Sequence, residues 1–164
     1  MMDVKKMSQA LLAAGVDLKK HQESFRPENA AVLAAMGMDQ TAIDFFATFS
    51  FNEAVSIGSY SYDQTNCFKK QIEWEEEFQR AAKANLLVVG SALNGDVVVL
   101  DLADYQVGLL KHEEFWEDQD VNPREYLVKM NCSLGQFFWN AISDEDYPQD
   151  AYEAAEYTNA DARE

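Results

Sequence analysis

The first part of the chain carries apolar residues at the three- and four-residue spacing of amphipathic helices. Residues 3–16 place their apolar side chains on one face, and Asp3 stands where its carboxylate can cap the first turn. Pro27 suits the first turn of a second helix that ends at Gly37. A third apolar stripe runs over 39–47. The pattern therefore predicts three helices before the first strand.

In residues 54–84 the spacing of the apolar positions changes from that of a strand to that of a helix. Residues 54–62 alternate loosely between apolar and polar positions and predict a strand. Residues 68–84 return to helical spacing, and the expected buried face of this helix consists of Trp74, Phe78, Ala81 and Ala82. We interpret the acidic cluster of this segment as a solvated helix face, in preference to a metal or catalytic cluster. Its members are Glu73, Glu75, Glu76 and Glu77.

The clearest local pattern is a β-hairpin followed by a third strand. Two apolar runs, 86–91 and 97–102, flank Asn94-Gly95, which is typical of tight hairpin turns because both central positions of the favoured turn need positive φ. A third strand is predicted over 105–111, which extends the hairpin to an antiparallel meander. The middle strand is apolar on both faces, so we expect helices or loops to cover both.

Two more helices are predicted beyond the meander. Asn122 and Pro123 provide a cap and a first-turn proline for one, and an S-x-x-Q capping box that begins at Ser133 opens the other. These elements define an α+β fold, in which an antiparallel β-sheet packs with N-terminal and C-terminal helices as one domain over 1–142. Residues 143–164 are acidic and lack a long apolar period, so we expect a mobile or loosely docked tail.

The charge of the chain restricts its partners. Its 13 basic residues stand against 29 acidic ones and give a net charge of −16. Phosphate backbones and anionic membranes repel such a surface, so we expect no nucleic-acid or membrane binding, whereas basic protein partners are steered in. The alternative is that acidity serves solubility alone. Cys67 and Cys132 lie outside any CxxC spacing and are expected to be reduced thiols of a cytoplasmic protein.

The sequence contains no established catalytic or metal-binding motif. It has neither a G-x-S-x-G elbow nor an H-E-x-x-H pair, and two stretches that begin like calcium loops lack the required glycine and glutamate. His112 could act as a general base, but no second catalytic group is identifiable, and a surface histidine is the simpler interpretation. We assign no catalytic residue, metal ligand or cofactor. A carboxylate-dependent hydrolase stays as a lesser alternative, because 29 acids always leave some pair at a workable separation.

The candidate binding site is the acidic segment between the last meander strand and the following helix. It holds Phe115 and Trp116 among carboxylates, and an aromatic anchor inside an acidic rim is typical of a surface that binds a basic protein. The alternative places both rings in the core, since Trp and Phe bury well. The predicted partner-binding residues are Glu113, Glu114, Trp116, Glu117, Asp118 and Asp120.

Short pieces of residues 86–142 also form a recognisable pattern. They are Leu87-Val88-Val89-Gly90, Asn94-Gly95-Asp96, Val99-Leu100-Asp101-Leu102, Gly108 to His112 with the acidic segment, and Ser133-Leu134 with Phe137-Phe138. This pattern resembles the SUKH superfamily, which includes fungal cell-wall-synthesis regulators and many bacterial proteins encoded beside toxins. The resemblance implies an α+β domain with an antiparallel sheet, no catalytic residues, and often a role as an immunity protein that neutralises a toxin.

We therefore expect a non-catalytic, cytoplasmic protein-binding domain. As an immunity protein, it would cover the basic site of a nuclease-like toxin with its acidic face, and charge complementarity would speed the capture. The alternative is a regulatory scaffold of cell-wall and envelope metabolism that binds several partners without blocking an enzyme. The sequence does not indicate an oligomeric state.

Overall fold

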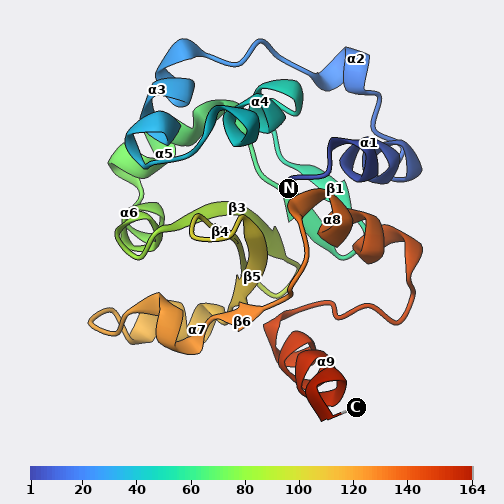
Figure 1. Ribbon diagram of the computed structural model, residues 1–164, viewed down its shortest axis with the longest axis vertical. Helices are drawn as coiled ribbons and strands as arrows, with labels where there is room; N and C mark the ends of the chain where they lie inside the picture. The colour runs from blue at the N-terminus through green and yellow to red at the C-terminus, as the bar shows by residue number, and fades with distance from the viewer. Residues whose placement is uncertain (164) are drawn as a thin grey trace.

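The computed structural model describes residues 1–163, with side chains as far as Thr158, and contains a six-stranded antiparallel sheet (Figure 1). The strands lie side by side in the order in which they occur along the chain. They are β1 (Val55–Ile57), β2 (Tyr60–Tyr62), β3 (Leu86–Ala92), β4 (Val97–Asp101), β5 (Gln106–Leu110) and β6 (Val128–Lys129). The predicted α+β fold with an antiparallel meander is confirmed.

Helices surround this sheet, and those from the two ends of the chain meet. The helices are α1 (Val4–Ala13), α2 (Leu18–His21), α3 (Pro27–Ala35), α4 (Gln40–Thr48), α5 (Phe68–Trp74), α6 (Glu76–Lys83), α7 (His112–Glu117), α8 (Leu134–Ser143) and α9 (Ala151–Arg163). Helix α1 packs against α8. Their predicted caps are confirmed, because Asp3 accepts from the Lys6 N–H and Ser133 accepts from the Gln136 N–H, both at 3.1 Å.

Both faces of the sheet are covered, as the apolar pattern of the middle strand predicts. On one face, Val98 and Leu100 of β4 join the main core, which is rich in aromatic side chains. On the other face, Val99 belongs to a smaller cluster with Phe78 of α6 and Phe115 of α7. This smaller cluster attaches α7 to the sheet, and α7 carries most of the predicted binding residues.

The predicted β3–β4 hairpin is present, but its turn differs from the two-residue turn that Asn-Gly favours. Gly95 has φ 94°, whereas Asn94 is not among the residues with positive φ. The Gly95 N–H donates to the Ala92 carbonyl at 3.1 Å, and the Ala92 N–H donates to the Asp96 carbonyl at 2.8 Å. These bonds close a three-residue loop with one left-handed glycine, and they leave the Asp96 side chain fully buried.

The helix predicted over 68–84 is divided in two, and this corrects the expected position of Trp74. Glu75 has extended backbone angles, φ −107° and ψ 119°, so α5 ends before it and α6 begins after it. Phe78 and Ala81 of α6 are buried as predicted, but Trp74 is 79% exposed. A helical stripe requires a constant 100° rotation per residue, and one extended residue breaks that rotation.

Two other predicted elements are also shorter than expected. The strand predicted over 54–62 folds back at Gly58, where φ is 62°, into β1 and β2. A Cβ at this glycine would collide with the Ala141 carbonyl, so the close approach of α8 requires glycine. The helix predicted after Pro123 is a single 3-10 turn, η2 (Pro123–Tyr126), because the chain then pairs with β5 as β6.

The C-terminal segment contains a helix that its residue pattern did not indicate. Ala151 and Ala154 of α9 are fully buried, and α9 contacts β5 and β6. These alanines are too small to give a clear apolar period, so the residue pattern did not indicate this helix. Residue 164 of the predicted tail lies outside the described residues. The expected mobility of this segment stays a prediction.

Candidate protein-binding surface

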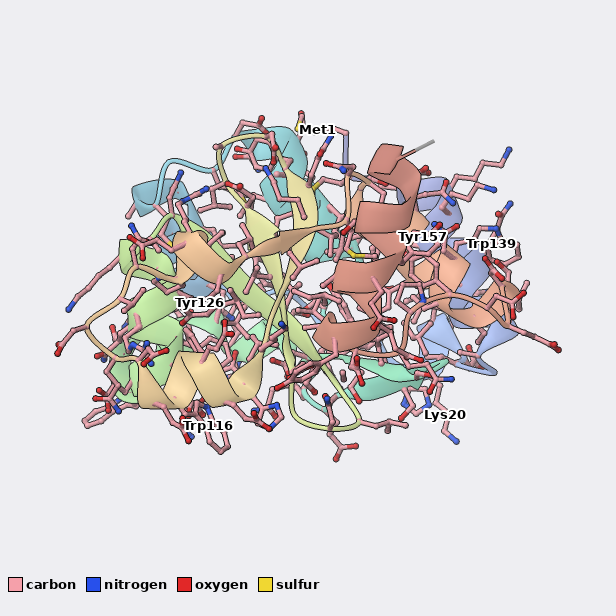
Figure 2. The ribbon with its side chains drawn as sticks, turned by 90° about the horizontal axis from the view of Figure 1, so that it is seen from below. Met1, Lys20, Trp116, Tyr126, Trp139 and Tyr157 are labelled. Atoms are coloured by element: carbon pink, nitrogen blue, oxygen red, sulfur yellow. The ribbon has the colours of Figure 1, made fainter. Side chains whose placement is uncertain are left out.

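Helix α7 directs one of its two rings into the core and the other to the surface. Phe115 is fully buried in the smaller core cluster, whereas Trp116 is 55% exposed and lies at the surface in Figure 2. The alternative in which both rings bury is therefore right for Phe115 and wrong for Trp116. Glu114 is half-buried, and the other predicted binding residues are exposed. The name α7 face is used below for these six residues: Glu113, Glu114, Trp116, Glu117, Asp118 and Asp120.

Arg80 of α6 holds the C-terminal end of α7. Its guanidinium donates to the Phe115 carbonyl and, at 3.4 Å, to the Asp118 carbonyl, and it lies 4.5 Å from the centroid of the Phe115 ring. A cation at this position also suits the negative end of the helix dipole. Together with the burial of Phe115, these contacts fix the rotation of α7 about its axis and so place Trp116 outside.

Asp96 holds the N-terminal end of α7. Its buried carboxylate accepts from the backbone N–H of His112 at 3.0 Å and lies 2.5 Å from Nδ1 of the same residue. It also accepts from the Ala151 N–H at 2.9 Å and from the Asn94 side chain at 3.1 Å. Burial acts to raise the pKa of Asp96, but the hydrogen bonds from His112, Ala151 and Asn94 outweigh it and hold the pKa below its ordinary value. One carboxylate thus joins the β3–β4 turn, α7 and α9.

The His112 ring lies between the buried carboxylate and the surface. Its Nδ1 faces Asp96, and its Nε2 lies 3.9 Å from Oε1 of Glu113. The ring also makes an edge contact with Trp116, with 6.0 Å between the ring centroids. In many enzymes a carboxylate orients the histidine that acts as the general base. Here Nε2, the nitrogen that faces away from Asp96, lies near a second carboxylate, that of Glu113. The contacts on the two sides of the imidazole support a positioning role for the ring beneath Trp116.

Helix α9 borders the α7 face. The Tyr152 hydroxyl donates to Oε2 of Glu113 at 2.9 Å, and Nζ of Lys111 lies 4.7 Å from the centroid of the Tyr152 ring. The Asp96 carboxylate accepts hydrogen bonds from the first residues of α7 and α9, His112 and Ala151. The α7 face therefore depends on the docking of α9, which the sequence did not indicate.

A second buried aspartate, Asp101, has a structural role at the end of β4. Arg124 binds both of its oxygens, at 2.6 and 3.0 Å, and Lys129 lies at 3.1 Å. Burial acts to raise the pKa of Asp101, but hydrogen bonds from Arg124, the Ala103 N–H and Lys129 outweigh it and bring the pKa to about 2. Arg124 also donates to the Ala84 carbonyl at 2.6 Å, so it ties η2 to both β4 and α6.

One carboxyl group has the opposite shift. At the end of β2, burial and then the nearby charge of Glu75 raise the pKa of Asp63 to about 6. Raised carboxyl pKa values occur at acid–base sites and also where a structure simply buries an acid. Asp63 was not singled out by the sequence, because its shift arises from packing that no local pattern encodes.

Several features bear on other classes of function. Among the described residues, no group of three or more His, Cys, Asp or Glu side chains is arranged to hold a metal ion. In the same part of the chain, no helix is both long and apolar enough to cross a membrane. The thiol of Cys132 is largely buried, and this burial raises its pKa to about 11.

No protein-family model, no curated protein and no solved structure matches this chain. The class that the fold and the surface define is thus an α+β domain with an acidic, tryptophan-bearing helix fixed at both ends. Its relation to the SUKH superfamily stays a prediction.

Sequence reasoning found the residues of this surface but missed the groups that hold them. The acidic segment with its two aromatic residues identified the α7 face. The sequence pattern singled out neither Asp96, which follows the Asn94-Gly95 turn, nor Arg80 in the helix predicted over 68–84. The signal that points to Asp96 is an acid placed between a tight turn and an apolar strand, where its side chain has few routes to solvent.

Proposed function

We propose that this chain is a non-catalytic protein-binding domain that docks a basic protein through the α7 face. The observation that carries the proposal is the 55% exposure of Trp116 on a helix whose two ends are fixed. An exposed indole on a rigid support loses little conformational entropy on binding, and Trp is one of the residues enriched at the energetic centres of interfaces. The five acids around it supply the polar rim.

The charge around Trp116 selects the kind of partner. Glu113, Glu117, Asp118 and Asp120 are exposed and flank Trp116 within residues 113–120. A negatively charged surface of this kind speeds the association of a basic partner by about 10- to 1,000-fold at low salt. It also excludes nucleic acids, because their phosphates repel it.

In the immunity role, the partner is a toxin encoded beside this chain. Nuclease-like toxins bind phosphate backbones through lysine and arginine side chains, so their active sites are basic. The α7 face would cover such a site and compete with its nucleic acid. The SUKH resemblance supports the same role, since many members of that superfamily are encoded beside toxins.

The proposal is tested with the purified product of the neighbouring gene and variants of this chain. Trp116→Ala is expected to weaken binding by about 2 kcal/mol, or about 30-fold in Kd, because it removes the central anchor. The triple variant Glu113→Lys, Glu114→Lys and Glu117→Lys is expected to slow association by at least about tenfold. Surface plasmon resonance at two salt concentrations separates the two effects.

A matched control has the same change in charge on another part of the surface. Glu23, Glu28 and Glu53 are exposed glutamates that precede β1, and their replacement by lysine changes the net charge by the same amount. This control is expected to alter association far less than the triple variant on α7. Equal effects of the two triple variants would show that net charge acts without the α7 face, and unchanged affinity of both α7 variants would refute the proposal.

Immunity and regulation are separated by growth. Co-expression of this chain with the neighbouring gene product is expected to rescue growth of a cell that the product alone kills, and the Trp116→Ala variant is expected to rescue it less. Binding without rescue would contradict the immunity role and favour a regulatory scaffold.

A further inference from the structure

A second exposed apolar surface lies on the first two helices. The loop between α1 and α2 forms a groove of about 470 Å³, lined mainly by Leu11, Leu12, Val16 and Leu18. Leu12 is 79% exposed at its edge. A leucine this exposed beside a groove of this size is a feature of surfaces that receive an apolar side chain from outside.

The segment that forms this groove has the opposite net charge to the chain as a whole. Residues 1–22 carry four lysines and two aspartates, a net charge of +2, whereas the whole chain has a net charge of −16. In the described part of the chain, none of Lys5, Lys19 and Lys20 has an ion-pair partner. The one carboxylate in the groove, Asp17, accepts from the Lys19 N–H as the cap of α2.

The chain itself presents the complement of this groove. The α7 face has a large exposed ring among carboxylates, and the groove has an apolar floor on helices that also expose Lys5, Lys19 and Lys20. Figure 1 shows α1 and α2 at one corner of the molecule and α7 at the opposite corner, and Figure 2 shows Lys20 and Trp116 well apart. Neither face can therefore reach the other within one molecule.

We propose that the α1–α2 groove receives the α7 face of a second copy of this chain in a head-to-tail contact. Trp116 of one copy enters the groove beside Leu12 of the next, and the acids of α7 meet Lys5, Lys19 and Lys20. The contact uses two different surfaces, so it is heterologous, and each added copy leaves one free groove and one free α7 face.

Two electrostatic effects of opposite sign act on this contact. Two copies that each carry −16 repel one another over long distances, whereas the lysines and glutamates attract at contact distance. At about 0.1 M salt the Debye length is about 10 Å, which screens the long-range repulsion more than the close pairs. Association is therefore strongest at intermediate salt, and it weakens both at low salt, where repulsion acts at full range, and at high salt.

The contact regulates the proposed function and rests on it, because both use the α7 face. A copy whose α7 face occupies a groove cannot bind the basic partner. Self-association therefore stores the chain in an inactive form at high concentration, and a partner that binds more tightly releases monomers.

The test uses full-length chains in sedimentation equilibrium at about 0.1 M salt, up to about 1 mM, where weak contacts are detectable. The weight-average mass of the wild-type chain is expected to rise with concentration above 18.6 kDa. Leu12→Asp and Trp116→Ala are each expected to stay monomeric. Trp74→Ala, which removes another exposed indole, is expected to associate as the wild type does.

Mixing the two inactive variants gives the decisive result. Leu12→Asp keeps an intact α7 face and Trp116→Ala keeps an intact groove, so an equimolar mixture is expected to form a dimer of twice 18.6 kDa and no larger species. A wild-type chain that stays monomeric throughout, or a mixture that stays monomeric, would overturn the proposal. Association that persists in Leu12→Asp would overturn it as well.

The result is separable from the proposed function. Leu12→Asp is expected to bind the neighbouring gene product with wild-type affinity, because it leaves the α7 face unchanged. If the wild type binds that product but never self-associates, only the head-to-tail contact is refuted. If it self-associates as described but binds no such product, only the proposed function fails.

Discussion

Asp96 is the residue whose replacement tests the construction of the α7 face most severely. Asp96→Asn preserves the size of the side chain but replaces one accepting oxygen with a donating amide group. The buried carboxylate now accepts from His112, Ala151 and Asn94, and these partners are all donors. The side-chain oxygen of an asparagine can still accept from the donors on one of these two sides. On the other side, its NH2 group would face donors with which it cannot form a hydrogen bond.

The expected cost follows from the bonds that are lost. Hydrogen bonds to an ionised acceptor contribute about 1.5–3 kcal/mol, and an unsatisfied buried N–H costs about 1–3 kcal/mol. Loss of the bond to the Ala151 N–H and weakening of those to His112 give an expected destabilisation of about 2–4 kcal/mol. Because domains are typically stable by about 5–15 kcal/mol, this is a large fraction of the total.

Urea unfolding at pH 7, followed by tryptophan fluorescence, measures this cost. Asp120→Asn is the control, since it removes the same charge from an exposed site and is expected to change the stability by less than about 0.5 kcal/mol. The folded-state pKa of Asp96 lies below its unfolded value, so its contribution is present above pH 4 and is lost as pH falls. The difference between Asp96→Asn and the wild type is therefore expected to shrink toward pH 3. A cost below about 0.5 kcal/mol at pH 7 would refute the role assigned to Asp96.

Two further substitutions have expected effects of opposite sign. The folded-state pKa of Asp63 is about 6, above the 3.8 of an unperturbed Asp. The neutral carboxyl group therefore contributes stability that is fully present below pH 3.8 and is lost as pH rises through 6. Asp63→Asn is therefore expected to raise stability to urea by about 1–3 kcal/mol at pH 7 and to give no such gain at pH 4, and a loss at pH 7 would contradict the burial of an ionised Asp63. Arg124→Met is expected to destabilise the fold by about 2–4 kcal/mol, because it removes the bidentate ion-pair partner of the buried Asp101 carboxylate and leaves the pair with Lys129. The pKa of Asp101, about 2 in the wild type, is expected to rise in this variant, so acid unfolding begins at higher pH, and an unchanged acid transition would contradict the ion pair.

The sheet was largely predictable because its pattern is local. Asn94-Gly95 between two apolar runs is enough to predict β3 and β4, and the apolar residues on both sides of β4 predict two covered faces. The sequence could not place Trp74, because a single extended residue at Glu75 divides the helix without any change in residue type. It could not predict β6 either, because a strand of two residues is too short to show an alternating pattern.

The composition of the α7 face was predictable, but its orientation was not. The segment was expected to connect a strand to a helix, and a connection without regular structure does not define the angle between neighbouring side chains. In the structure it is helical, so Phe115 and Trp116 point about 100° apart and only one of them can face the core. Arg80 and Asp96 decide which one, and both come from elements that are distant in sequence.

The most direct test of the central claim is hydrogen exchange of the full chain, alone and with a saturating amount of the neighbouring gene product. Backbone amides of residues 112–120 are expected to exchange more slowly in the complex, while those of α3 and α4 stay unchanged. Protection confined to another surface, with exchange in α7 unaffected, would contradict docking through Trp116 and its acidic rim.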